Sequence, residues 1–325
     1  MANAKLSELS LFTDAEIQSL QQNGISTAHQ ILSVPSWKLR YILNTATNDD
    51  AEDYLRKVVF KTNIIPQTLI TNPRTAWKMY EEYSNIKLHL PLRDIPTFNQ
   101  LFKGGVSLNS ITEIVGQSMS GKTEFCLTAI CDMIMEADDY GCVLFDTEKK
   151  QISIVQRLFQ ILRSRESQLS DEEIERKICD RCTIIDVSNS KELIESLDNL
   201  EEYIFEKNIK LLVIDSLGTL ASKEFMGKEG GIFERASVLQ TEATLLKQLS
   251  EKFKVGILVT NTSSSENEQA HLGVNWYHFV NHRLKIYKVD RSKVILSIQK
   301  SPLVSNANIS LTIEDTGVKE IVVTE

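Results

Sequence analysis

The sequence of 325 residues has no surplus of positive charge, because 36 Lys and Arg residues stand against 44 Asp and Glu residues, for a net charge of −8. A domain that coats nucleic acid by itself usually carries a basic excess. Any contact with nucleic acid must therefore come from a local basic patch or through a partner.

Long apolar segments are absent as well. No stretch approaches the roughly 20 apolar residues that span a bilayer. The first residues, MANAKLSELS, do not join a basic start to an apolar run, so they lack the pattern of a secretory signal. We therefore expect a soluble, intracellular protein with no membrane among its partners.

Cysteine is scarce, and its count is odd. The five cysteines are Cys126, Cys131, Cys142, Cys179 and Cys182. A disulfide framework is not expected in a chain of this size. The Cys179-x-x-Cys182 pair is compatible with half of a zinc site or with a redox pair. No second pair accompanies it, and Cys182 leads into the strand-like run TIID, so we favour neither role.

The first part of the chain predicts short helices. Thr13 and Asp14 are typical of a helix start, Asn23-Gly24 of a helix end, and Ser26 or Thr27 begins the next helix. Apolar residues recur here at helical intervals: Ile17, Leu20, Ile25, Ile31, Leu32, Leu39 and Ile42. Two short helices around a glycine turn resemble a helix-hairpin-helix module, which can contact the DNA backbone. Because the segment is not basic, a small domain that contacts protein is an equal alternative.

The pattern changes twice along the chain. Residues 61–85, KTNIIPQTLITNPRTAWKMYEEYSN, contain two prolines and little initial periodicity, which is typical of a linker. From residue 86 onward, strand and helix patterns alternate, which favours an α/β domain with a mostly parallel sheet. We therefore divide the chain into a helical domain over 1–60, a linker over 61–85 and an α/β domain over 86–325.

The large domain contains several buried strands. Nearly continuous apolar runs of the kind that central parallel strands show are SITEIV (110–115), CVLFD (142–146), TIIDV (183–187), KLLVID (210–215) and VGILVTN (255–261). The C-terminal part differs, since RLKIYKV and VILSIQ flank the turn DRSK, and ISLTIED and VKEIVVT flank Thr316-Gly317. Such pairs of alternating segments predict antiparallel β-hairpins.

The stretch GQSMSGKT, residues 116–123, follows a predicted strand and opens a predicted helix. It matches the P-loop pattern G-x-x-x-x-G-K-T. Backbone N–H groups of such a loop bind phosphate oxygens, Lys122 would reach the β and γ phosphates, and Thr123 would ligate Mg²⁺. We therefore expect ATP and Mg²⁺ to bind. The residues expected at the nucleotide are Gly116, Gln117, Ser118, Met119, Ser120, Gly121, Lys122 and Thr123.

Two acidic residues complete the predicted site. Asp215 ends the apolar run KLLVID, which is the placement of the second acid of a magnesium site. Hydrolysis also needs a group that orients the attacking water, and the segment FDTEKK offers Asp146 and Glu148. Glu148 is the better candidate, because it lies beyond the strand end and can project into the crevice where ligands bind. A surface glutamate without a catalytic role is the alternative.

Taken in order, these segments carry a family resemblance. SITEIVGQSMSGKTEFC, VLFDTE, KLLVIDS, ILVTN and the late KSP resemble those of the eukaryotic RecA-like strand-exchange recombinases and their paralogs. With the helical front domain, the resemblance extends over nearly the whole chain. Within the family, LEEYIFEKNIKLLVIDSLGTLASKEF, LGVNWYHFVNHRL and Lys300-Ser301-Pro302 are similar to the B-type paralog. The resemblance implies a RecA-like P-loop ATPase core that binds ATP at the edge of one subunit, against its neighbour.

The resemblance also implies roles for individual residues at the nucleotide. Residues 116–123 would hold the phosphates, Asp215 would lie in the magnesium environment, and Glu148 would orient the water. Arg157 is the nearest counterpart of the arginine that stacks on adenine. Lys300 to Pro302 would lie in a cap that reaches a neighbouring subunit's nucleotide.

Two loops would face DNA, and here the sequence departs from the recombinases. The loops would lie in residues 222–235 and 262–275. Thr262 follows ILVTN, where recombinases have a glutamine that senses the γ-phosphate. The second loop holds Glu266 and Glu268 but no Lys or Arg, and an acidic loop repels phosphate. The linker has no clear Phe-x-x-Ala, the motif by which recombinases join their own copies.

These departures favour a paralog over a recombinase. We expect an ATP-binding nuclear protein of homologous recombination and DNA double-strand break repair. It would be a subunit of a heteromeric complex with other paralogs that assists recombinase filament assembly on single-stranded or branched DNA. It would also be a weak DNA-dependent ATPase. The alternative is a strand-exchange recombinase that acts as a homopolymeric filament. An unrelated P-loop enzyme such as a nucleotide kinase would need an arginine-rich lid, which the sequence lacks.

Overall fold

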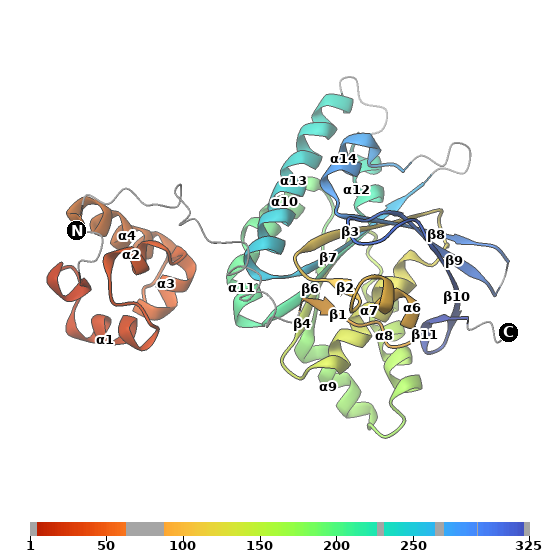
Figure 1. Cartoon of the computed structure of the whole chain (residues 1–325), viewed down its shortest axis with the longest axis horizontal. Helices are drawn as coiled ribbons and strands as arrows, with labels where there is room; N and C mark the ends of the chain where they lie inside the picture. The colour runs from red at the N-terminus through yellow and green to blue at the C-terminus, as the bar shows by residue number, and fades with distance from the viewer. Residues whose placement is uncertain (1–4, 63–87, 226–230, 264–269, 291, 322–325) are drawn as a thin grey trace. The chain divides into compact units, whose positions relative to one another are not determined.

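The computed structural model describes residues 5–62, 88–225, 231–263, 270–290 and 292–321. The chain divides into two compact units, Met1–Ile86 and Lys87–Glu325, which we describe separately (Figure 1). The linker predicted over 61–85 lies outside the described residues except for its first two, which end a helix. No helix within the described ranges is both long and apolar enough to cross a membrane.

The smaller unit consists of short helices around one apolar core. They are η1 (Leu6–Glu8), α1 (Asp14–Gln22), α2 (Ala28–Leu32), α3 (Ser36–Leu43) and α4 (Asn48–Thr62). Thr13 and Thr27 begin α1 and α2, and each forms a capping box, with Glu16 and Gln30 respectively. Both helix starts agree with the sequence pattern. The buried core contains Leu6, Leu20, Ile25, Ala28, Ile31, Leu39, Leu43, Ala51 and Val58.

The larger unit is built on a nine-stranded sheet with the strand order β11-β10-β9-β8-β3-β7-β6-β4-β5. Its strands are β3 (Ser110–Gly116), β4 (Gly141–Asp146), β5 (Cys182–Asp186), β6 (Ile209–Asp215), β7 (Gly256–Thr262), β8 (His282–Lys288), β9 (Val294–Lys300), β10 (Asn308–Glu314) and β11 (Gly317–Glu320). Neighbours from β8 to β5 are parallel, whereas β8 to β11 form antiparallel pairs. The predicted α/β class, mostly parallel with C-terminal hairpins, is confirmed. A separate short pair joins β1 (His89–Leu90) to β2 (Val106–Ser107).

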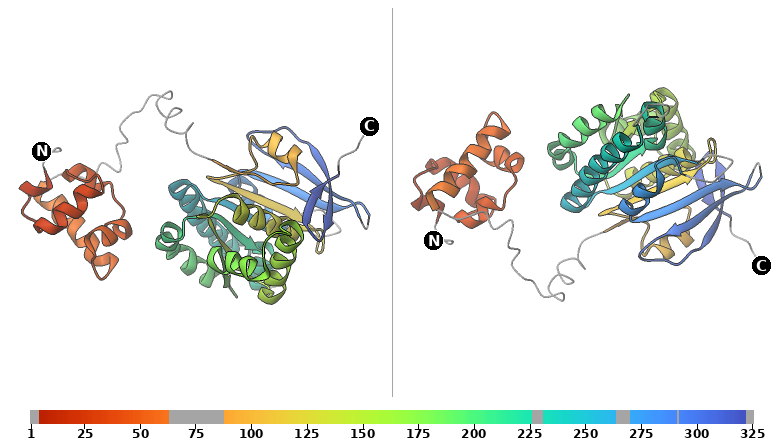
Figure 2. Two further views of the ribbon diagram at one scale, coloured as in Figure 1. Left: turned by 90° about the horizontal axis from the view of Figure 1, so that it is seen from below. Right: turned by 90° about the horizontal axis from the view of Figure 1, so that it is seen from above.

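Helices form an apolar core with each face of the large sheet. One core contains residues of α6 (Pro96–Leu101), α7 (Lys122–Glu136), α8 (Gln151–Arg165) and α9 (Asp171–Arg181). The other contains residues of α10 (Ser190–Asp198), α11 (Leu200–Glu206), α12 (Leu217–Phe225), α13 (Gly231–Phe253) and α14 (Gly273–Phe279). Figure 2 shows green and teal helices lying against the sheet, which the blue C-terminal strands continue.

The strand β6 shows why its sequence is apolar without alternation. Successive side chains of a strand point to opposite faces of the sheet. Leu211 and Val213 lie in the core with α7, whereas Leu212 and Ile214 lie in the core with α13. Both faces of this strand are buried from Leu211 to Ile214, so its polar side chains stand near its two ends, at Lys210 and Asp215. The same constraint places the polar ends of the other parallel strands at this edge.

Candidate nucleotide-binding site

The P-loop connects β3 to α7 along a path that requires glycine at both ends. Gly121 precedes α7 with a φ of +107°, in a region that L side chains rarely adopt. A Cβ added to Gly116 would lie 2.3 Å from the Ile286 carbonyl oxygen and 2.5 Å from Ser120 Oγ. The two glycines of the motif are therefore needed for the backbone itself. The start of a 15-residue helix then offers N–H groups and a favourable dipole to an anion.

The Lys122 side chain folds back over this loop. Its Nζ donates hydrogen bonds to the carbonyl oxygens of Gly116 at 2.9 Å and Gln117 at 2.7 Å. The residue is only 8% exposed. Burial lowers the pKa of Lys122, and the nearby carboxylates of Asp215 and Glu148 oppose that effect. A buried ammonium group directed into a glycine loop is suited to a polyphosphate.

Thr123 and Asp215 meet as the sequence predicts for a magnesium site. Thr123 Oγ1 donates to Asp215 Oδ2 at 2.6 Å, and the other oxygen of Asp215 accepts from Thr260 Oγ1 at 2.5 Å. The three residues come from α7, β6 and β7. A hydroxyl and a carboxylate are the oxygen ligands that Mg²⁺ takes, so Thr123 and Asp215 fit that ion.

The structure distinguishes the two acids of FDTEKK. Asp146 is buried, and its carboxylate accepts from the backbone N–H of Glu148 at 2.9 Å and of Lys150 at 2.5 Å. It therefore shapes the turn after β4. Both acids line a cleft of about 190 Å³ that Thr123 and Asp215 also border, but only Glu148 is partly exposed. Of these two acids, Glu148 is placed to orient a water molecule, although this role stays a prediction.

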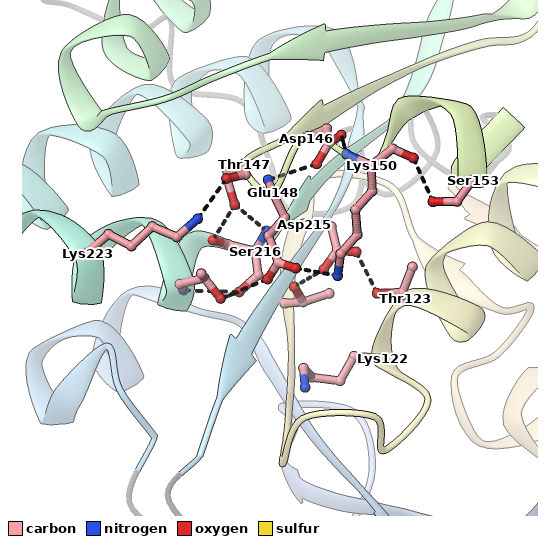
Figure 3. Close-up of polar contacts among 12 residues, drawn as sticks. Lys122, Thr123, Asp146, Thr147, Glu148, Lys150, Ser153, Asp215, Ser216 and Lys223 are labelled. Carbon is pink, nitrogen blue, oxygen red and sulfur yellow. Dashed lines mark hydrogen bonds and ion pairs between the residues drawn. The ribbon is translucent and has the colours of Figure 1, made fainter.

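Each carboxylate oxygen of Glu148 has a partner. Oε1 accepts from Thr219 Oγ1 at 3.1 Å, and Oε2 forms an ion pair with Lys150 Nζ (Figure 3). Burial would raise the pKa of Glu148, but the contacts with Lys150 and Thr219 and the charge of Lys223 lower it. The same contact raises the pKa of Lys150, because the Glu148 carboxylate stabilises the charged ammonium. Glu148 is thus held as a carboxylate surrounded by positive charge.

The hydroxyl of Thr147, next to Glu148, links the segments that follow β4 and β6. Thr147 Oγ1 donates to the Ser216 carbonyl at 3.0 Å and accepts from the Ser216 N–H at 2.9 Å. Lys223 Nζ, on α12, donates to the Thr147 carbonyl at 3.3 Å (Figure 3). The segment carrying Glu148 is therefore fixed to β6 and to α12, which leads toward the first predicted DNA loop.

Arg157 lies on α8 at the rim of the same cleft. Its Nε donates to Glu124 Oε2 at 2.9 Å, and its Nη2 donates to the Glu314 carbonyl at 2.6 Å. These bonds hold the guanidinium between α7 and the end of β10. Its position beside Thr123 is compatible with a contact to the nucleotide, and stacking on adenine stays a prediction.

The remaining P-loop residues border larger hollows. Gln117, Ser118 and Met119 are exposed at the turn of the loop. A cavity of about 600 Å³ adjoins residues 116–120 and the strands β8 and β9. A second cavity, of about 360 Å³, adjoins residues 119–124 and the turn between β8 and β9. The loop is therefore open to a ligand from both sides.

Helices and a strand occupy the ends of the two ranges in which the DNA loops are predicted. Within 222–235, α12 continues to Phe225 and α13 begins at Gly231, because Phe225 is buried in the core and extends the helix. Residues 226–230 lie outside the described residues. Within 262–275, the strand β7 ends at Thr262, α14 begins at Gly273, and residues 264–269 are likewise not described.

The predicted cap residue Lys300 makes contacts within its own chain. Its Nζ donates to the carbonyl oxygens of Tyr277 at 2.6 Å and Val280 at 2.8 Å, at the end of α14. The ammonium also lies 4.6 Å from the centre of the Tyr277 ring, a cation–π contact. Contact of this segment with a neighbouring subunit stays a prediction.

Sequence reasoning missed three residues of the site: Thr219, Thr260 and Lys150. The two threonines have no local signal, because they approach the acids from α12 and β7 only after folding. Lys150 did have a local signal in the sequence, since two lysines directly follow Glu148 in FDTEKK. The cysteines do not take part, and all five are free, with Cys126, Cys131 and Cys142 buried.

Comparison with known proteins finds a family whose sequence model matches the part of the chain that contains this site. A model of the Rad51 family matches residues 94–321, which contain every residue of the nucleotide site. The chain is 29% identical over 257 residues to DNA repair protein RAD51 homolog 2 of Homo sapiens, covering 69% of this chain and 66% of that protein. The mouse protein of the same name is 30% identical over 253 residues, covering 67% and 72%. That of Arabidopsis thaliana is 24% identical over 335 residues, covering 93% and 87%. These matches agree with the resemblance drawn from the motifs.

Proposed function

The chain belongs to the Rad51 family, and from this membership we propose that it is a nuclear DNA repair paralog acting in homologous recombination. It is an ATP-binding subunit of a heteromeric complex that assists recombinase filaments to assemble on single-stranded DNA. The observation that carries the proposal is the convergence of Lys122, Thr123 and Asp215 at the end of a parallel sheet, inside the matched region. The names of the relatives, which describe DNA repair proteins, support the branch.

ATP and Mg²⁺ fit the residues of the site. The P-loop supplies N–H groups and the Lys122 ammonium, and Thr123 with Asp215 supplies oxygen atoms. When bound, Mg·ATP would supply the polyphosphate, and the metal would neutralise charge on the leaving group. The chain's own residues bind and orient the phosphates, and Glu148 holds the attacking water.

We propose that bound ATP serves mainly to hold this subunit against a partner, with slow turnover. Three features support a slow enzyme. The second predicted DNA loop carries Glu266 and Glu268 and no Lys or Arg, Thr262 replaces the glutamine expected of a recombinase, and Glu148 is ion-paired. The subunit therefore depends on paralog partners for contact with DNA, whereas a recombinase would polymerise by itself.

Substitution of Lys122 tests this function. We expect Lys122→Ala to weaken ATP binding by roughly tenfold to a hundredfold, because a charge-assisted contact with phosphate is lost. Assembly with partner paralogs should weaken in parallel. Fluorescent ATP-analogue titration and light scattering with single-stranded DNA measure both quantities.

The control is Lys247→Ala, which removes an exposed lysine on α13 with the same change of charge. Unchanged complex formation and DNA binding in Lys122→Ala would contradict the proposal. Long ATP-dependent filaments of the unmodified chain alone, with brisk turnover, would instead support a strand-exchange recombinase.

A further inference from the structure

Lys150 is attached to the nucleotide site at two points. It is the last residue before α8, and its backbone N–H donates to Asp146 Oδ2 at 2.5 Å. Its ammonium forms the ion pair with Glu148 Oε2 (Figure 3). Because the backbone bond fixes where the side chain starts, the ammonium is held within reach of Glu148 although the side chain is 58% exposed.

The ion pair affects the acceptor on which hydrolysis depends. A carboxylate that orients and deprotonates water needs an available lone pair with sufficient basicity. Thr219 engages one oxygen of Glu148 and Lys150 engages the other. Each oxygen keeps a further lone pair, but a cation in direct contact withdraws charge from both.

Other cations face Glu148 from the surrounding elements. Lys122 approaches from α7 and Lys223 from α12, and both interact electrostatically with it. Lys122 is committed to carbonyl oxygens of the P-loop, and Lys223 donates to the Thr147 carbonyl. Among these lysines in the described structure, Lys150 alone makes a direct ion pair with the carboxylate.

We propose that Lys150 is a positioning residue that restrains Glu148 in this ion pair, so that bound ATP is hydrolysed slowly and the assembled state persists. The inference rests on the proposed function of the nucleotide site and explains how that site can hold ATP with an intact set of catalytic groups.

The neighbouring lysine provides a matched control. Lys149 is exposed, carries the same charge and lies one residue nearer to Glu148 in the sequence. Within the described residues, no ion pair of Lys149 with a carboxylate is found. Lys149→Gln therefore removes the same charge from the same turn while leaving the ion pair of Glu148 in place.

The first experiment measures steady-state ATP hydrolysis by the full chain with its partner paralog. We expect Lys150→Gln to raise kcat on the order of tenfold, a small part of what a positioned base contributes, with KM for ATP unchanged. Lys150→Arg should keep the low rate, because an arginine can maintain the ion pair. Lys149→Gln should also keep it. In a Glu148→Gln background, Lys150→Gln should give no increase.

A second measurement needs no nucleotide. In the full chain labelled with ¹³C at glutamate carboxyl groups, the Glu148 signal is identified by its loss in Glu148→Gln. We expect it to titrate at a higher pH in Lys150→Gln than in the unmodified chain, and at an unchanged pH in Lys149→Gln. A purely structural contribution of Lys150 would not move this titration selectively.

The outcomes separate this inference from the proposed function. A fall in kcat in Lys150→Gln would mean that Lys150 assists the reaction, and the inference would be wrong. Unchanged kcat and an unchanged Glu148 titration would also overturn it, while loss of ATP binding in Lys122→Ala would leave the proposed function standing. An unmodified chain that does not bind ATP would overturn both.

Discussion

The two halves of the nucleotide site differ in how their residues are held. Lys122 and Thr123 begin α7, whose buried face packs on the sheet, and Asp215 ends the strand β6. The hydrogen bond between Thr123 and Asp215 joins the helix to the sheet. Glu148 and Lys150 lie in a turn beyond β4, where their side chains are partly exposed and hold each other by charge. The phosphate-binding half is therefore fixed by packing, whereas the half concerned with water can be adjusted by a single surface residue.

The largest effect should come from disturbing the packed half. Gly116→Ala would place a methyl group 2.3 Å from the Ile286 carbonyl oxygen, and overpacking of this kind costs about 1–3 kcal/mol. The loop can relieve it only by moving the N–H groups that bind phosphate. We expect ATP affinity to fall by up to roughly 150-fold, which corresponds to about 3 kcal/mol, measured by calorimetric titration. Ser118→Ala, at an exposed position of the same loop, should bind ATP as before.

Changing Glu148, in the half of the site concerned with water, should leave ATP binding intact. Glu148→Gln keeps the shape of the side chain but removes the charge that orients water. We expect turnover to fall roughly a hundredfold, while ATP affinity stays within about a factor of two because Glu148 has no part in the phosphate loop. Single-turnover hydrolysis and equilibrium binding measure the two quantities. Equal losses in both would show that the two halves are not separable.

A carboxylate outside the site has a pKa that is shifted in the opposite direction to that of Glu148. Glu242, on α13, is fully buried, and burial raises its pKa to about 8, opposed by Ser190 and assisted by Glu224. The unfolded chain releases this proton at the ordinary glutamate pKa of 4.5, so the folded state binds more protons between pH 4.5 and 8. Its contribution to stability is therefore fully present below about pH 4.5 and is lost as pH rises to about 8.

The effect on the nucleotide site is the smallest of the three, because Glu242 lies outside that site. Between pH 6 and pH 9, Glu242 should reduce the free energy of unfolding by about 2–3 kcal/mol. Glu242→Gln should remove that part of the decline, as measured by urea unfolding at both pH values. Glu251→Gln, an exposed position on the same helix, serves as the control and should leave the decline unchanged. ATP binding should not respond to either variant.

The same division explains what the sequence could predict. The P-loop and Asp215 are recognisable because their elements are continuous apolar runs that end in particular residues, so local pattern and position agree. The helix starts at Thr13 and Thr27 were predictable because a capping box lies within four residues. In these places the determining contacts are close in sequence.

The remaining features depend on contacts that no local pattern contains. Thr219 and Thr260 reach the acids across 71 and 45 residues of sequence. By contrast, Glu148 could be preferred to Asp146 from local position, and the bonds of Asp146 to the N–H groups of Glu148 and Lys150 span only two and four residues. The end of α12 at Phe225, inside the range predicted for the first DNA loop, follows from the burial of Phe225 in the core.

The sheet order has a consequence for the time at which the phosphate loop can form during synthesis. The strand β3, which carries the loop, pairs with β7 and β8, and Arg283 of β8 reaches back 170 residues to Glu113 of β3 at 2.5 Å. The described helices of the smaller unit end at Thr62, but β3 lacks both neighbours until most of the chain has left the ribosome. Contacts this distant are slow to close. A nascent chain interrupted before β8 would leave β3 as an open edge, without the Ile286 backbone against which Gly116 packs.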